Sequence, residues 1–135
     1  MSKRQTRTPD LNERDLKKIT LRESQKKYFN TILENDITFC YGPAGTSKTF
    51  TACYTAIKLL LEKGVNRIIL TKPIQESGEK LGHLPGDVDE KIEPYMQSYV
   101  SNLNKIIGGN SASWLTTRGK IEYKPLAYMR GATFE

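Results

Sequence analysis

The sequence predicts an α/β domain in which helices flank a parallel sheet. Short β-branched and aromatic runs alternate with segments of helical periodicity, and the connections between them are short. A glycine-bearing octapeptide also stands directly between one predicted strand and the helix that follows it. With 135 residues the chain can bury a core without disulfides or a structural metal, so one compact domain is expected.

The first predicted element is a helix over residues 20–35. Thr20 and Glu23 have the spacing of a capping box. In this motif the threonine side chain caps the helix, and the glutamate three residues later accepts a hydrogen bond from the threonine N–H. Apolar side chains then recur at helical spacing as far as Asn35, which suits a C-terminal cap. The preceding residues 1–19 are expected to form a flexible, basic tail, so that the domain itself covers residues 20–135.

Two strands and a helix are predicted next. Residues 37–41 (ITFCY) are β-branched and aromatic, which indicates a buried strand inside the parallel sheet. A helix is expected over residues 48–63, ending at Gly64. Residues 67–71 (RIILT) form a second run apolar enough for a buried parallel strand.

The following segment is polar and then helical. Residues 75–86 carry several glycines and are predicted to form an ordered loop. A long helix is expected from Val88 to Ile107, bent in its early part by Pro94 and ended by the GGN sequence at residues 108–110.

The last part of the chain contains less regular signals. Trp114 and Leu115 are predicted to be a small packed segment that anchors the core. Residues 121–123 are predicted to be a short strand, after which residues 125–131 lead to the end of the sequence.

Composition limits the class of protein. The chain has 21 basic and 15 acidic residues, and its first 30 residues hold nine basic and four acidic ones. This basic start fits either a contact with a phosphate-rich partner or a solvated tail, and the sequence leaves both open. No apolar run exceeds four residues and no signal peptide is seen, so a cytoplasmic protein is expected. Two cysteines, Cys40 and Cys53, and one histidine, His83, do not suffice for a zinc site, and both thiols are expected to be reduced and buried.

The octapeptide GPAGTSKT matches the phosphate-loop pattern GxxxxGK(S/T) between a strand and a helix. In this pattern the backbone N–H groups and the helix N-terminus surround the phosphates, Lys48 supplies a cation, and the Thr49 hydroxyl ligates Mg²⁺. The residues assigned to nucleotide binding are Gly42, Pro43, Ala44, Gly45, Thr46, Ser47, Lys48 and Thr49. Ser47 stands where a second glycine is expected, at a cost on the order of 1 kcal/mol if the position needs a positive φ.

Several segments together resemble the PhoH family of bacterial and bacteriophage ATPases. The phosphate loop is similar to that family's GPAGTGKT, with serine for one glycine. Residues 71–87 (TKPIQESGEKLGHLPGD) resemble its R-P-x-x-x-x-GEKLGFLPGD stretch, and residues 90–95 (EKIEPY) its EKxxPY helix start. Residues 125–133 (PLAYMRGAT) resemble its PLAYMRGRT motif. The resemblance covers residues 20–135 in the family's order.

The resemblance implies a RecA-like phosphate-loop NTPase fold, related to the N-terminal half of superfamily 1 helicases, that uses ATP or ADP with Mg²⁺. It implies that Gln25 reads the adenine edge, although an ordinary exposed helix residue also fits that position. Lys72 and Arg130 become candidate contacts to RNA or single-stranded nucleic acid. An ordinary surface lysine also fits position 72. Arg130 also fits a contact to nucleotide or a neighbouring subunit, or a structural role in holding its loop. The family resemblance also implies a homo-oligomer, in the form of a hexameric ring.

The sequence departs from the family at its end. Members continue into an apolar strand that ends in Asp-Glu, the Walker B element, whereas this sequence stops at Glu135. The C-terminal strands are therefore expected to be missing from this sequence, which fits either a fragment of a longer protein or a natural truncation. Glu76, Glu79 and Asp87 are not favoured as substitutes for the missing carboxylates. An ATPase in its complete form is the leading interpretation, and a small-molecule kinase and a non-catalytic nucleotide-binding module stay open. Arg118 is the sole arginine in residues 71–120, which disfavours the arginine-rich lid of a kinase.

Overall fold

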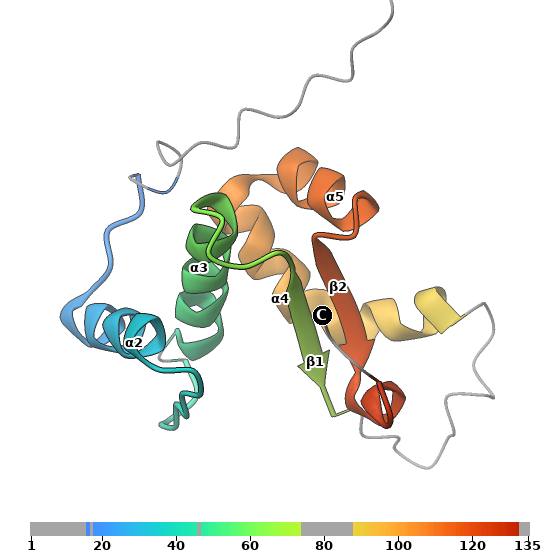
Figure 1. Ribbon diagram of the computed structural model, residues 1–135, viewed down its shortest axis with the longest axis horizontal. Coiled ribbons are helices and arrows are strands. Elements are labelled where there is room, and N and C mark those ends of the chain that lie inside the picture. The colour runs from blue at the N-terminus through green and yellow to red at the C-terminus, as the bar shows by residue number, and fades with distance from the viewer. Residues whose placement is uncertain (1–15, 17, 46, 74–87, 133–135) are drawn as a thin grey trace, which may run out of the picture.

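The structure is a computed structural model that describes residue 16 and residues 18–45, 47–73 and 88–132 (Figure 1). In chain order, its elements are α2 (Glu23–Glu34), α3 (Lys48–Leu61), β1 (Ile68–Lys72), α4 (Val88–Ile107), α5 (Gly109–Thr117), β2 (Ile121–Pro125) and the 3₁₀ helix η2 (Leu126–Met129). The residues outside these ranges include Thr46, Glu76, Glu79, His83 and Asp87, so the predictions made for them lie outside the described residues.

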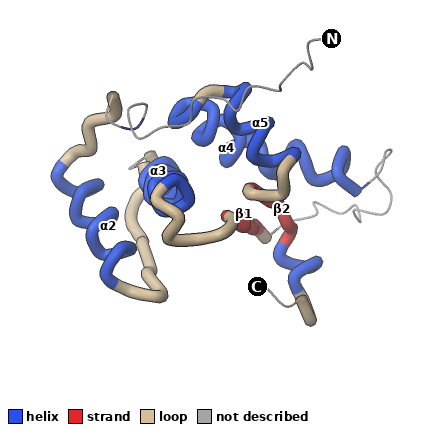
Figure 2. The backbone as a smooth tube through the Cα atoms, turned by 45° about the horizontal axis from the view of Figure 1, so that its top comes forward, coloured by secondary structure: helices blue, strands red, loops and turns tan. Residues whose placement is uncertain are grey.

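β1 and β2 form a parallel two-stranded sheet, which confirms the α/β prediction. Ile68 lies opposite Ile121, and Lys72 lies opposite Pro125. The connection between the two strands includes α4 and α5, as parallel strands require a long crossover (Figure 2). The Arg67 guanidinium, just before β1, lies 3.1 Å from the Glu122 carboxylate on β2 and ties the two strands together at their starts.

The core lies where α3, α4, α5 and the sheet meet. Its central side chains are almost fully buried because they point inward from each of these elements. The largest of these hydrophobic residues are Ile57 on α3, Met96 and Leu103 on α4, and Ile121 on β2. α3 packs against α2 on one side and against α4 on the other, so the helix that starts at the phosphate loop is held by the whole domain (Figures 1 and 2). α4 continues through Pro94.

The start of the first described long helix differs from the prediction. α2 begins at Glu23, and its N-cap is Arg22 rather than Thr20. The Arg22 N–H donates to the Gln25 side-chain oxygen at 2.8 Å, so the glutamine performs the backward contact that was predicted for Glu23. Upstream of this cap, Leu16 is 3% exposed and belongs to the core, although its sequence position had suggested the tail.

The predicted buried strand over residues 37–41 is wrong for this structure. This segment is not a strand, and Ile37, Phe39 and Tyr41 are 76%, 89% and 94% exposed. Cys40, predicted to be buried, is also exposed, whereas Cys53 is buried as expected. The physical reason is that β-propensity stabilises a strand only where a neighbouring strand pairs with it. In the described part of the chain, β1 and β2 pair with each other and neither pairs with this segment.

The long helix α4 ends at Ile107, as predicted from the GGN sequence at residues 108–110, and Leu115 lies in the core, as predicted for the segment around Trp114. The finding that the sequence did not predict is that this segment is itself a helix, α5, which begins at Gly109. Gly108 has a φ of 82°, a conformation that glycine adopts without strain and that lets the chain turn sharply between the two helices. α5 is amphipathic, with Ala112 and Leu115 buried on one side. None of the helices in the described ranges is long and apolar enough to cross a membrane.

Candidate functional site

The phosphate loop precedes α3 at the end of the molecule toward which the strands point. β1 and β2 run in parallel, and α3 begins near their carboxyl ends (Figure 1). Ligands of open α/β sheets bind at this end, outside the carboxyl ends of the strands. The geometry therefore places the octapeptide where a bound phosphate is expected in such folds.

Three described residues of the loop have a positive φ, and the first of them, Gly42, has a φ of 155°. Gly45 has a φ of 82°, and Ser47, the N-cap of α3, has φ 62° and ψ 30°. The position of the missing glycine thus does require a positive φ, and serine adopts it at a cost of about 1 kcal/mol. The first intrahelical bond runs from the Thr51 N–H to the Ser47 carbonyl at 3.0 Å. The N–H groups before Thr51 consequently have no carbonyl of α3 to bind, which makes this helix start suitable for an anion.

Lys48 closes the loop on itself. Its ammonium donates to the carbonyl oxygens of Gly42 and Pro43, each at 2.7 Å. These contacts hold the cation beside the loop, where it can exchange carbonyl oxygens for the more negative oxygens of a phosphate. Thr49, the predicted magnesium ligand, is exposed in the first turn of α3.

The donor set suits Mg²⁺ only together with a phosphate. No group of three or more histidine, cysteine, aspartate or glutamate side chains within the described ranges is placed to hold a metal. Mg²⁺ commonly keeps several water ligands and binds through one or two protein oxygens plus substrate phosphates. An exposed Thr49 hydroxyl at the loop fits that role.

Gln25, the predicted adenine reader, is 8% exposed, and its side-chain oxygen accepts the Arg22 N–H. Its amide N–H groups remain as donors, but the oxygen that would accept from an adenine amino group is engaged in capping α2. A bidentate contact with adenine therefore either uses the second lone pair of this oxygen or breaks the capping bond.

Sequence reasoning missed a contact from the same helix cap. The Arg22 guanidinium donates to the Ser47 hydroxyl at 3.3 Å, so a residue 25 positions earlier in the chain reaches the phosphate loop. The sequence carried one signal of it: Ser47 adds a side-chain acceptor at a position where the family pattern has glycine.

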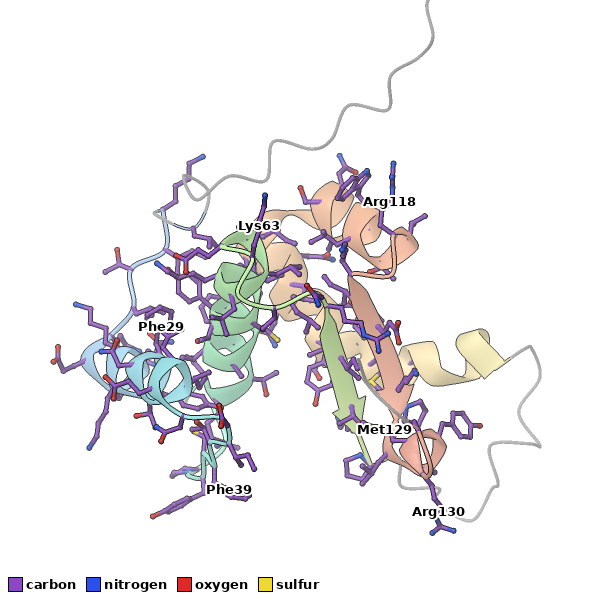
Figure 3. The ribbon with its side chains drawn as sticks, viewed as in Figure 1. Phe29, Phe39, Lys63, Arg118, Met129 and Arg130 are labelled. Carbon is purple, nitrogen blue, oxygen red and sulfur yellow. The ribbon has the colours of Figure 1, made fainter. Side chains whose placement is uncertain are left out.

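Lys72 and Arg130, the predicted nucleic-acid contacts, are both exposed at the carboxyl end of the sheet. Lys72 is the last residue of β1, and Arg130 follows η2 and points away from the body of the molecule (Figure 3). Both lie at the same end of the fold as the start of α3. The structure does not show either side chain in contact with described residues of the phosphate loop.

The perturbed ionisable groups are buried ones. Burial raises the pKa of the Cys53 thiol to about 11, and burial also raises the pKa values of Tyr28, Tyr99 and Tyr123. All four groups are therefore neutral at pH 7. The Tyr99 hydroxyl donates to the Thr71 carbonyl at 2.8 Å, which indicates a structural role at the sheet.

A cavity of about 820 Å³ lies away from the phosphate loop, between α4, α5 and β2. Met96 and Ile121 are among the apolar side chains that line it, and Asn104 and Glu122 are among the polar ones. None of the described residues of the phosphate loop contributes to its lining.

Comparison with known proteins identifies the family. The family model described as "PhoH-like protein" matches residues 18–135. A PhoH-like protein of Synechocystis sp. is 48% identical over 109 residues, which are 81% of this chain and 33% of that protein. The PhoH-like protein of Bacillus subtilis is 43% identical over 111 residues, covering 82% of this chain and 35% of the relative. Protein PhoH of Escherichia coli is 38% identical over 127 residues, which are 92% of this chain and 36% of that protein.

The matched part of this chain thus spans about a third of the length of these relatives. The family match extends over nearly all of the sequence and includes the phosphate loop and both strands. The chain therefore belongs to the PhoH-like family.

Proposed function

We propose that residues 42–49 bind ATP or ADP together with Mg²⁺. The observation that carries the proposal is the geometry at the start of α3. Gly45 and Ser47 turn the backbone through left-handed conformations, and Lys48 holds its ammonium against the loop. Such a loop offers backbone N–H donors, a helix dipole and a cation to the same phosphate group.

The proposed function of the complete protein is ATP hydrolysis. In this proposal the loop binds and orients the phosphates, and the Thr49 hydroxyl contributes one oxygen ligand to Mg²⁺, which offsets charge that develops on the transferred phosphoryl group. Hydrolysis also requires a carboxylate that orients the attacking water. The chain covers about a third of the length of its relatives, and the proposal assigns that carboxylate to a part of the family sequence that the chain does not cover.

The roles of the remaining predicted residues are part of the same proposal. Gln25 reads the adenine ring after its oxygen leaves the Arg22 N–H, and Lys72 and Arg130 contact RNA or single-stranded nucleic acid as an effector. The complete protein assembles into a homo-oligomeric ring, proposed to be a hexamer, in the cytoplasm.

The test is calorimetric titration of Mg-ATP and Mg-GTP into the chain. Lys48→Ala should weaken binding of both nucleotides by about 2 kcal/mol, roughly 30-fold, because it removes a charged donor from the phosphates. Lys105→Ala, which removes an exposed lysine from the last turn of α4, is the matched control and should bind normally. Gln25→Ala should reduce the preference for ATP over GTP.

Two results would contradict these assignments. Equal affinity of Lys48→Ala and the unchanged protein would remove the phosphate site from residues 42–49. An equal loss for ATP and GTP in Gln25→Ala would mean that the glutamine supports α2 and does not read the base.

A further inference from the structure

The side chain of Arg22 reaches the phosphate loop from a different helix. Its guanidinium donates to the Ser47 hydroxyl at 3.3 Å, and Ser47 is the N-cap residue of α3. The phosphate-loop pattern has glycine at this position, which offers no side-chain acceptor. The contact thus exists because a serine occupies the position directly before Lys48.

Arg22 is held in place by its backbone. Its N–H donates to the Gln25 side-chain oxygen at 2.8 Å, and its carbonyl accepts the Lys26 N–H at 2.9 Å. α2, which begins directly after Arg22, packs against α3. The packed helix pair therefore places the Arg22 backbone where its guanidinium reaches the start of α3.

The contact with Ser47 uses only a small part of the capacity of the guanidinium. A guanidinium has five N–H donors in a planar fork, whereas the serine hydroxyl is a neutral acceptor at a long distance. In the described part of the chain, no carboxylate forms an ion pair with Arg22. A phosphate is a stronger acceptor, and it matches the fork with two parallel hydrogen bonds.

We propose that Arg22 is a second phosphate-binding cation of this site, acting beside Lys48. When nucleotide binds, the guanidinium moves from the Ser47 hydroxyl onto a phosphate oxygen next to the α3 N-terminus. This inference rests on the proposed nucleotide site. It assigns to the cap of α2 a role in holding the phosphates, separate from the adenine contact proposed for Gln25.

The test uses two ligands, Mg-ATP and tripolyphosphate, of which the second has no base or sugar. Arg22→Gln should weaken both by about tenfold, as expected for the loss of a charged hydrogen bond at a solvent-accessible site. Lys27→Gln is the matched control: it removes one positive charge from an exposed position of α2 and should leave both affinities within about twofold. Arg22→Lys keeps the positive charge but loses the planar fork of donors, so its affinities should lie between those of Arg22→Gln and Lys27→Gln.

Ser47→Gly separates a phosphate contact from simple support of the loop. If Arg22 binds phosphate, Arg22→Gln should weaken binding by a similar factor in the Ser47→Gly background. If the effect disappears there, Arg22 acts through Ser47 and the proposal is wrong. A loss confined to ATP, with tripolyphosphate unaffected, would also overturn it, because Arg22 would then contact the base or sugar.

The remaining outcomes separate this inference from the proposed function. Binding that is sensitive to Lys48→Ala but insensitive to Arg22→Gln overturns the role of Arg22 alone. Absence of binding of either ligand to the unchanged protein overturns the nucleotide site and this inference with it. Circular dichroism should show equal helix content for all variants. If Arg22→Gln loses helix, the affinities of Arg22→Lys for Mg-ATP and tripolyphosphate decide the role of Arg22 instead.

Discussion

Replacement of Ile57 by alanine tests whether α3 is anchored as the structure shows. The Ile57 side chain is fully buried, and it belongs to the same core cluster as Leu103 of α4 and Ile121 of β2. Loss of three buried carbon groups costs about 2.5 kcal/mol in transfer free energy. The unfilled space adds on the order of 1 kcal/mol, so the free energy of unfolding should fall by about 3–4 kcal/mol.

Urea denaturation, followed by the fluorescence of the single tryptophan, Trp114, and by circular dichroism, measures this loss. Ile57→Val should cost about 1 kcal/mol, because it removes one carbon. Leu33→Ala on α2 is the control: its side chain is 42% exposed, and the loss should stay below about 1 kcal/mol. A loss below about 1 kcal/mol for Ile57→Ala, or one equal to that of Leu33→Ala, would refute the placement of Ile57 at the centre of the core.

Three further predictions concern the two cysteines and the exposed segment over residues 37–41. At pH 8 the native protein should react with one equivalent of a thiol reagent through exposed Cys40, and with a second only when denatured. Because the folded-state pKa of Cys53 lies above that of an exposed thiol, stability should fall as pH rises from about 9 toward 11, and Cys53→Ala should reduce that slope. Phe39→Ser should change the free energy of unfolding by less than about 0.5 kcal/mol, whereas a loss above about 1.5 kcal/mol would restore the predicted buried strand.

Local sequence patterns were sufficient to predict those elements whose conformation depends mainly on their own residues. The helical periodicity after the phosphate loop predicted α3. The apolar run that became β1 was predicted as a strand of a parallel sheet, and the segment that became β2 was predicted as a short strand. The GxxxxGK(S/T) pattern located the loop before α3, and the structure shows that Ser47, which replaces the second glycine, has a positive φ. These features follow from backbone conformation and side-chain periodicity, which a short window of sequence contains.

Other features depended on partners that are distant in the sequence. Residues 37–41 have the composition of a buried strand, but in the described fold no strand pairs with them, so Phe39 and Cys40 are exposed. Composition shows that a segment can pair, and only the tertiary arrangement supplies the partner.

The same limit applies to the site. The sequence determined the family, the phosphate loop and its lysine, because each is encoded in contiguous residues with fixed spacing. It did not determine that Arg22 contacts Ser47, or that Gln25 uses its oxygen to cap α2. Those contacts arise where the start of α2 meets the start of α3. Their geometry is decided by helix packing, which the spacing of residues along one chain segment does not fix.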